Sequence, residues 1–424
     1  MPDLDANADA PASLWQRYRR LPRNVVALGL VSLLNDASSE LIYPFLPLFL
    51  SLTLGASPAV VGFIEGGAES LSSLLKLWAG HFSDRVGKRK SLLVLGYGLA
   101  NVARPFIGFA GSWPQVLAIR LTDRFGKGIR GAPRDAMIAD SANPAQRGLA
   151  FGFHRAMDHT GAVIGPLLGY GLVWLLAKNR DLLTAADYKL LFLIAAVPAL
   201  AAIFVVLFMV READAPHPTD APRKDPPKFS LAGFDGNFKF FLILVALFTL
   251  SNSSDAFLIL RAQQTGIPLS QIPLLWAALH LVKVLSSLLG GDLSDRLGRK
   301  SLIVSGWILY AAVYLGFAFV NSAQGAWTLF LVYGLYFGLC EGAEKALVAD
   351  LVKPELRGTA FGLYNLAFGI TVLPASLLTG FVWNWRGPRA AFILCACLGT
   401  LAAMLLLGVK TKAAAGAATA IGNG

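Results

Sequence analysis

The chain has 424 residues, of which 55% are hydrophobic and only 15% are charged, against about 25% charged in a typical soluble domain. Such a small number of charged side chains cannot shield the recurring apolar stretches from water. The composition therefore excludes a soluble protein and predicts a polytopic membrane protein in a lipid bilayer. The formal net charge of +11 does not indicate a nucleic-acid partner. The basic residues fall in short breaks between apolar runs and form no continuous basic face.

Apolar runs of about 20 residues, the length that crosses a bilayer, recur along the chain and predict twelve helices in two groups of six. We expect them near 24–50, 58–80, 90–111, 114–140, 148–177 and 188–210, and then near 238–262, 271–290, 301–320, 326–350, 358–383 and 389–409. A proline-rich, charged stretch separates the two groups and predicts a linker. The expected organisation is a tail at 1–23, a six-helix bundle at 24–210, a cytoplasmic linker at 211–235, a second bundle at 236–409 and a tail at 410–424.

Basic residues gather in alternate loops and so indicate the orientation. Four arginines precede the first run, whereas the loops at 51–57, 112–113 and 321–325 hold no basic residue. By the positive-inside rule, both termini are expected in the cytoplasm. We therefore expect a multi-pass protein of the inner (plasma) membrane, acting as a monomer.

The two halves of the chain repeat one another. The stretch Gly80-His-Phe-Ser-Asp84-Arg85-Val-Gly87-Lys-Arg89 is matched by Gly291-Asp-Leu-Ser-Asp295-Arg296-Leu-Gly298-Arg299-Lys. The stretches at 147–152 and 357–362 also match, and the number of residues between them is almost the same as for the first pair of stretches. These matches predict a duplicated six-helix unit, which is an established plan for transporters.

The stretch at 80–89 forms the loop between the second and third expected helices. Taken together, the spans, the repeat and this loop resemble the major facilitator superfamily of transporters. The loop is similar to the family motif GxLaDRxGRR, with Phe82 where the family has Leu. The resemblance implies an all-α fold of two pseudo-symmetric six-helix bundles and a conformational latch near the cytoplasmic loops. The latch candidates are Gly80, Asp84, Arg85, Gly87, Arg89 and Asp140, and in the second half Gly291, Asp295, Arg296, Gly298, Arg299 and Asp350. The alternative is that these bases only fix the topology.

A second motif lies in the fifth expected helix, where Gly161, Gly165, Pro166 and Gly169 form the pattern GxxxGPxxG. Small residues four apart let helices approach closely, and Pro166 removes a backbone hydrogen bond. The pattern resembles the motif of the antiporter branch of the family, which implies export. Ordinary close packing is the alternative.

Ionisable residues inside the expected spans are costly in lipid and are therefore candidates for function. The fourth expected helix carries a basic stripe on about a third of its circumference, made of Arg120, Arg124, Lys127, Arg130 and Arg134. The stripe predicts a water-filled cavity and an anionic, zwitterionic or metal-chelate cargo. The cavity candidates are Arg104, Asp123, Arg124, Lys127, His154, Arg155 and Asp255. Buried salt bridges that only hold helices together are the alternative. No metal site is expected, because the two histidines of the fifth helix lie on different faces.

Carboxylates in the same half are candidates for carrying protons, because a low-dielectric cavity favours the protonated form of a carboxyl group. The candidates are Asp36, Glu40 and Asp158. Arg120 resembles the arginine that the family uses in proton-coupled transport, although Arg124 stands where the family has Gly.

The chain holds no phosphate-binding GxxxxGK[ST] loop, so ATP is not the expected energy source. We expect a secondary transporter and not an enzyme, with no cofactor and with the proton motive force as its energy source. The leading hypothesis is proton-coupled export of a small charged or amphiphilic compound by alternating access. The alternatives are a proton symporter that imports an organic anion and a receptor that does not transport.

Overall fold

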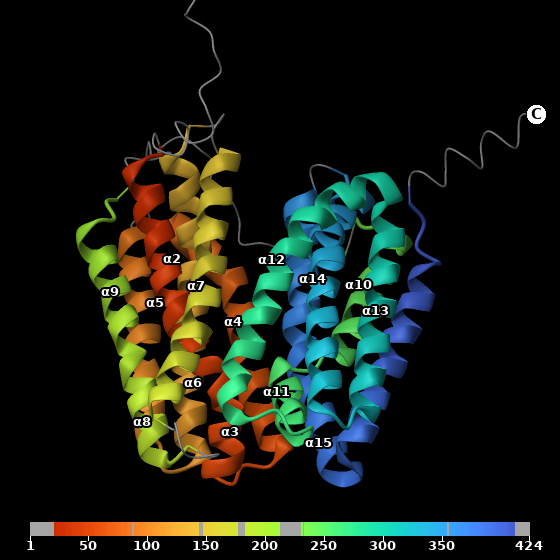
Figure 1. The fold of residues 1–424 in the computed structure, drawn as a ribbon. Coiled ribbons are helices and arrows are strands. Elements are labelled where there is room, and N and C mark those ends of the chain that lie inside the picture. The colour runs from red at the N-terminus through yellow and green to blue at the C-terminus, as the bar shows by residue number, and fades with distance from the viewer. Residues whose placement is uncertain are drawn as a thin grey trace, which may run out of the picture.

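The computed structural model describes residues 21–86, 89–143, 147–176, 183–212, 230–231, 233–353 and 356–411, without the side chains of 80–86, 147–148, 288–292 and 294–296. Within these residues the protein is α-helical and contains no strand. The helices form two bundles that stand side by side, α2–α9 in one and α10–α15 in the other (Figure 1).

The first bundle begins with α2, which continues through short 3-10, α and π turns as far as Thr53. Its elements are α2 (Arg23–Ile42), η1 (Tyr43–Phe45), α3 (Leu46–Leu48), η2 (Phe49–Thr53), α4 (Pro58–Val86), α5 (Arg89–Ala103), η3 (Arg104–Phe109), α6 (Trp113–Ser141), α7 (Arg147–Leu176), α8 (Ala185–Ile194) and α9 (Ala196–Phe208). Pro44 and Pro47 lie in the irregular turns. Because proline has no N–H to donate, a regular α-helix cannot run through this stretch unchanged.

The second bundle has the same plan. Its elements are α10 (Gly236–Ser251), α11 (Asp255–Gln264), η5 (Leu269–Gln271), α12 (Ile272–Leu297), α13 (Arg299–Phe319), α14 (Ala323–Leu351) and α15 (Arg357–Leu406). The start of α2 and the end of α15 lie at the same end of the molecule, which we call the termini end (Figure 1). The opposite end, with α3, α8 and α11, is the far end.

The helices of the described residues are consistent with twelve spans. Nine are long and apolar enough to cross a membrane, and one of these, α15, has 50 residues and holds two spans. The two are divided at Gly387, whose φ of 84° lies in the left-handed region that favours glycine. The helices α4 and α6 have 29 residues each but fall outside the nine, since ionisable residues interrupt their apolar sequence.

The seventh expected helix is broken, which the hydrophobic pattern did not predict. The chain leaves the helix after Ser251 and re-enters it at Asp255, with the Ser254 hydroxyl accepting a hydrogen bond from the N–H of Ala256 (3.3 Å). The Tyr310 hydroxyl donates to the carbonyl of Ser251 (2.6 Å) and satisfies a group that the break frees. The polar run Ser-Asn-Ser-Ser-Asp explains the break, because such side chains compete with the helix for backbone groups.

The two bundles touch mainly along two pairs of helices, α4 with α15 and α7 with α12. Glycines make the first contact close: a Cβ at Gly62 would meet the Ser376 backbone, and one at Gly380 would meet the backbone of Ala59. These contacts run from the far end to the middle of the spans. The bundles then diverge toward the termini end (Figure 1), so the far end is the closed end in this conformation.

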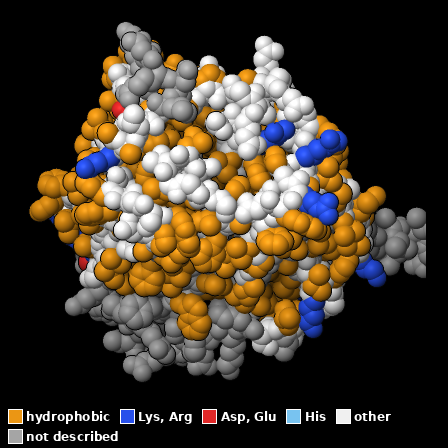
Figure 2. All heavy atoms as spheres, turned by 90° about the horizontal axis from the view of Figure 1, so that it is seen from below, with side chains coloured by type: hydrophobic (Ala, Val, Ile, Leu, Met, Phe, Trp, Pro, Cys, Tyr) orange, Lys and Arg blue, Asp and Glu red, His pale blue; other side chains and the backbone are white. Residues whose placement is uncertain are grey.

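The outer surface is apolar, as a bilayer requires. Large hydrophobic side chains stand exposed on outward helices, among them Val197, Phe204, Ile243 and Phe381, each at least 60% exposed. The far end seen in Figure 2 is likewise mostly hydrophobic or uncharged, with a few basic side chains. Exposed apolar area of this extent is unfavourable in water and favourable against lipid.

Candidate functional site

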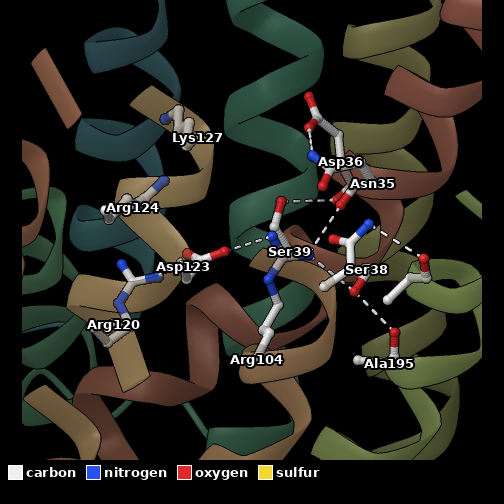
Figure 3. A network of polar contacts seen from close by, with 12 residues as sticks. Asn35, Asp36, Ser38, Ser39, Arg104, Arg120, Asp123, Arg124, Lys127 and Ala195 are labelled. Atoms are coloured by element: carbon white, nitrogen blue, oxygen red, sulfur yellow. Dashed lines mark hydrogen bonds and ion pairs between the residues drawn. The ribbon is translucent and has the colours of Figure 1, made fainter. Parts of the chain in front are cut away.

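Four helices of the first bundle meet at a buried network of charges (Figure 3). On α6, the Arg120 guanidinium makes two hydrogen bonds to Glu65 of α4, at 2.7 and 3.0 Å, and a third to Asp123 at 3.3 Å. All three side chains are buried. A buried arginine with two acidic partners is held rigidly, because any movement would leave charges without partners.

The network continues from Asp123 to α2. Asp123 Oδ1 accepts a hydrogen bond from Arg104 Nη2 (2.8 Å), and Arg104 Nη1 donates to the Ser38 hydroxyl (3.1 Å) and to the Asn35 carbonyl (3.3 Å). Arg104 begins η3, just after α5 ends. One set of charges therefore connects α2, α4, α6 and the end of α5.

One turn further along α6, Arg124 and Lys127 are paired only loosely. Each lies close to the limit for an ion pair with Glu69, at 3.9 and 3.8 Å, and Lys127 is 37% exposed. Both lie midway along α6, where an accessible charge must face water because lipid would exclude it. These two residues are the accessible basic groups of the site.

The rest of the basic stripe does not share that environment. Arg130 is buried with its guanidinium 4.3 Å from the centre of the Tyr97 ring, and Arg134 pairs with Asp135 (2.9 Å). The stripe spreads over a third of the helix, and α4 and α5 both pack on α6. Its members therefore face different neighbours.

The acids and bases of α2 and α7 lie opposite one another. Asp36 accepts a hydrogen bond from Asn35 Nδ2 (2.8 Å), and the charges that face it are those of Asp158, Glu40 and Arg130. On α7, Asp158 lies 3.8 Å from Arg155, which is 60% exposed. His154 is buried, with Nε2 2.7 Å from the Ser32 hydroxyl. Of the cavity candidates, Arg104, Asp123 and His154 thus lie inside the bundle, and Arg155 lies at its surface.

The GxxxGPxxG motif seats α7 on α2. A Cβ at Gly161 would meet the Leu33 carbonyl and the Cβ of Asp36, and one at Gly165 would meet the backbone of Ala37 and Glu40. The motif therefore packs against the part of α2 that carries both candidate proton carriers, Asp36 and Glu40.

The second bundle contributes polar groups to the same depth of the molecule. Asp255, at the start of α11, accepts a hydrogen bond from the Tyr333 hydroxyl (2.8 Å) and lies 3.7 Å from Lys283 Nζ. Trp276 Nε1 donates to Glu40 of the first bundle (2.8 Å). No sequence pattern pointed to Trp276 or Tyr333, because an aromatic residue in a span is normally interpreted as part of the apolar core.

At the termini end, two equivalent ion pairs occupy the two halves. Arg89 pairs with Asp140, and Arg299 pairs with Asp350, so each connects the starts and ends of neighbouring helices within one half. Gly298, between α12 and α13, has a φ of 83°. The other latch candidates, Gly80, Asp84, Arg85, Gly87, Gly291, Asp295 and Arg296, lie outside the described residues or have undescribed side chains.

A helix cap that the sequence did not predict completes this end. The start of α5 is capped by Glu212, which follows α9. Its carboxylate accepts hydrogen bonds from the backbone N–H groups of Arg89 (2.8 Å) and Lys90 (3.0 Å). An acid there satisfies orphan N–H groups and complements the helix dipole.

Comparison with known proteins agrees with this architecture. A family model described as Major Facilitator Superfamily matches residues 28–343 and 240–422. The chain belongs to the major facilitator superfamily. It is 36% identical over 397 residues to an MFS-type transporter of Methanocaldococcus jannaschii, covering 92% of this chain and 95% of that protein.

A more distant relative and a solved structure match this chain over most of their length. A multi-drug resistance efflux pump PmrA homolog of Lactococcus lactis is 25% identical over 386 residues, covering 88% of this chain and 91% of that protein. The solved structure of a bacterial homolog to the human lysosomal transporter Spinster, in an inward-facing and occupied conformation, has a TM-score of 0.73 at 17% identity. It covers 94% of this chain and 97% of that chain. This superfamily member is therefore a multi-pass membrane transporter with the expected all-α fold.

Proposed function

We propose that this transporter exports a small charged or amphiphilic compound in exchange for protons, by alternating access between its two bundles. The observation that carries the proposal is the packing of the antiporter-type motif on the acids of α2: Gly161 lies against Asp36, and Gly165 lies against Glu40. A motif associated with exchange thus fixes the helix that carries two accessible carboxylates. The resemblance to an efflux pump of Lactococcus lactis supports the same direction.

The proton is assigned to the carboxylates that are not locked into short ion pairs. Glu65 and Asp123 hold arginines at 2.7 and 2.8 Å, and a proton on either would leave a buried arginine uncompensated. Asp36 instead has an amide as its hydrogen-bond partner. Asp36 is therefore the first candidate for a proton carrier, and Arg120 acts by holding the network beside it.

The cargo is assigned to the accessible basic groups. Arg124 and Lys127 share one acid, Glu69, at the limit of ion-pair distance, so their hydrogen-bonding capacity is largely unused. An anionic group on the cargo would meet both, and an arginine is well suited to bind a carboxylate or phosphate through two hydrogen bonds. This favours anionic or amphiphilic compounds over lipophilic cations.

The test is proton flux in inverted vesicles that contain the purified protein. After a pH gradient is imposed, a panel of organic acids, chelators, antibiotics and metal complexes is added, and the internal pH is followed with a dye. An exporter should release protons from the acidic lumen when its cargo is added. Asp36→Asn should bind the cargo but lose the dependence of transport on the gradient. A full proton-driven rate in this variant would exclude Asp36 as the carrier.

A proton symporter that imports an organic anion is the second candidate, because Arg124 and Lys127 would serve an anion travelling in either direction. The same vesicles separate the two. A symporter would move cargo and protons in the same direction across the membrane, whereas an exporter would move them in opposite directions.

A further inference from the structure

One polar contact joins the two bundles through a carboxyl group and an imidazole. Oε2 of Glu40, on α2, accepts the hydrogen bond of Trp276 and lies 3.6 Å from Nε2 of His280, on α12. Trp276 and His280 are one turn apart, and their rings meet edge to face at 5.2 Å. The ring of Tyr43 packs on Trp276 at 5.0 Å. The contact is thus enclosed by aromatic rings at the junction of the halves.

The arrangement leaves a place for one proton. An indole N–H can only donate, so Trp276 bonds to Glu40 whether or not His280 is charged. Nε2 of His280 is inaccessible and makes no hydrogen bond with any described residue. A carboxylate and an imidazole at this distance are strongly coupled, because a proton on the imidazole creates an attraction that its loss removes.

The charges around the pair come from three further helices. His280 faces Lys283 on its own helix and His159 on α7, and Glu40 is near Asp36, one turn back on α2. The charge of Lys283 is offset by Asp255 of α11 at 3.7 Å. His159 in turn faces Arg155, Asp158 and Glu341. The carboxylate that can compensate a proton on His280 is therefore that of Glu40, in the other bundle.

We propose that Glu40 and His280 form a proton-binding site shared between the two bundles, and that the bound proton holds the far end closed. The inference rests on the proposed proton coupling and adds His280 as a second partner. With the proton bound, imidazolium and carboxylate attract each other across the junction, as in this conformation. When the proton leaves, the attraction is lost and α2 can separate from α12. An exporter needs this order, because release of the proton would then open the far end for cargo to leave.

The test measures the opening of the far end directly, without cargo or gradient. Spin labels are placed at Leu52 and Gln264, two exposed positions at the far ends of the two bundles. The three native cysteines are first replaced, and the protein is reconstituted in lipid nanodiscs. We expect the population with a long distance between labels to grow as the pH rises from about 4 to about 8, which covers ordinary histidine titration and the pH values below it.

Three variants and one control separate the groups. His280→Gln and Glu40→Gln should each abolish the dependence of the distance on pH. Trp276→Phe should retain it, because it removes a hydrogen bond but no titrating group. His159→Gln, a second histidine near the junction, should also retain it. Size-exclusion profiles and helical content check that each variant is folded.

The inference is overturned if the parent protein shows no change with pH, or if His280→Gln keeps the change while His159→Gln loses it. Its failure is distinct from failure of the proposed function. Vesicles could show proton-coupled export with a pH-insensitive far end, which would refute the shared site alone. If the far end opens with pH in a way that requires His280, but the vesicles show no proton-coupled flux, the proposed export coupling is refuted and the shared proton site is retained.

Discussion

Arg120 and Arg124 lie one turn apart on α6 and look alike in the sequence, but their surroundings differ. Arg120 is buried with two short hydrogen bonds to Glu65, whereas Arg124 is partly accessible and lies 3.9 Å from Glu69. The energetic consequence of losing a charge depends on how completely its partner is shielded from water. This difference leads to opposite predictions for the two residues.

Arg120→Gln should destabilise the protein by about 3–5 kcal/mol, because it leaves the Glu65 carboxylate buried without a partner. The double variant Glu65→Gln with Arg120→Gln should recover part of that loss, since neither group is then charged. The measurement is thermal unfolding of the purified variants in the same detergent. Equal instability of the single and double variants would show that the ion pair itself is not what stabilises the bundle.

Arg124→Gln should unfold at nearly the parental temperature, because a loose, accessible ion pair contributes only about 0–1 kcal/mol. Its cargo binding should weaken by roughly tenfold or more, which corresponds to a charged hydrogen bond of about 1.5–3 kcal/mol. Arg124→Lys keeps the charge and should lose less. Normal transport by Arg124→Gln would remove the argument for an anionic cargo.

The packing of α7 on α2 is the main example at the scale of an element. Gly161 and Gly165 bring the two backbones so close that any side chain would displace one of them. The same helix also carries Gly152, where a Cβ would meet nothing within 4 Å. The two kinds of glycine on one helix provide a matched comparison.

Gly161→Ala should destabilise the protein by about 1–3 kcal/mol, because the new methyl group forces α7 away from α2. It should also slow transport, since Asp36 is among the groups displaced. Gly152→Ala should leave stability unchanged or raise it by up to about 1 kcal/mol through helix propensity. Thermal unfolding and initial transport rates check both, and similar behaviour of the two variants would argue against a specific role for the motif.

The sequence predicts elements better than it predicts contacts. The spans, the repeat and the small-residue face of α7 follow from periodicity and composition, which report on each segment separately. The pairing of Arg120 with Glu65 does not, because periodicity places residues on a face without identifying the helix opposite. The run of Ser and Asn before Asp255 favours a break in the helix. The strong hydrophobic pattern on both sides nevertheless predicts one continuous helix.

At the scale of the whole molecule, the described residues carry an equivalent ion pair at the termini end of each half. Arg89 with Asp140 and Arg299 with Asp350 each lie within one half. These two pairs therefore join helices of the same half in this conformation, and they do not themselves join the halves. In the present conformation these pairs fix the ends of helices α5, α6, α13 and α14.

Asp140→Asn and Asp350→Asn should therefore change the balance between conformations while the protein still inserts. We expect transport to fall in both, and the exchanged pair Arg89→Asp with Asp140→Arg to recover part of it. Distances between labels across the termini end measure the balance, and surface labelling of the loops checks the topology. If the balance between conformations is unchanged in both single variants, these residues have a purely structural role.

The charges shared by α4 and α6 have a consequence for how the protein is made. Neither helix belongs to the nine that are apolar enough to span a membrane by themselves, and each carries the partners of the other. When α4 leaves the ribosome, Glu65 and Glu69 have no counter-ion, because α6 has not yet been synthesised. The nascent chain must therefore keep α4 near the insertion machinery until α6 arrives.

Chains truncated after α5 should consequently integrate α4 poorly, and chains that extend through α6 should integrate it well. A glycosylation site placed between α4 and α5 would report the difference, because that loop reaches the glycosylating side only when α4 fails to integrate. Arg120→Gln should reproduce the poor integration in the longer chain. If α4 integrates fully without α6, its charges must be tolerated by lipid or by the machinery alone.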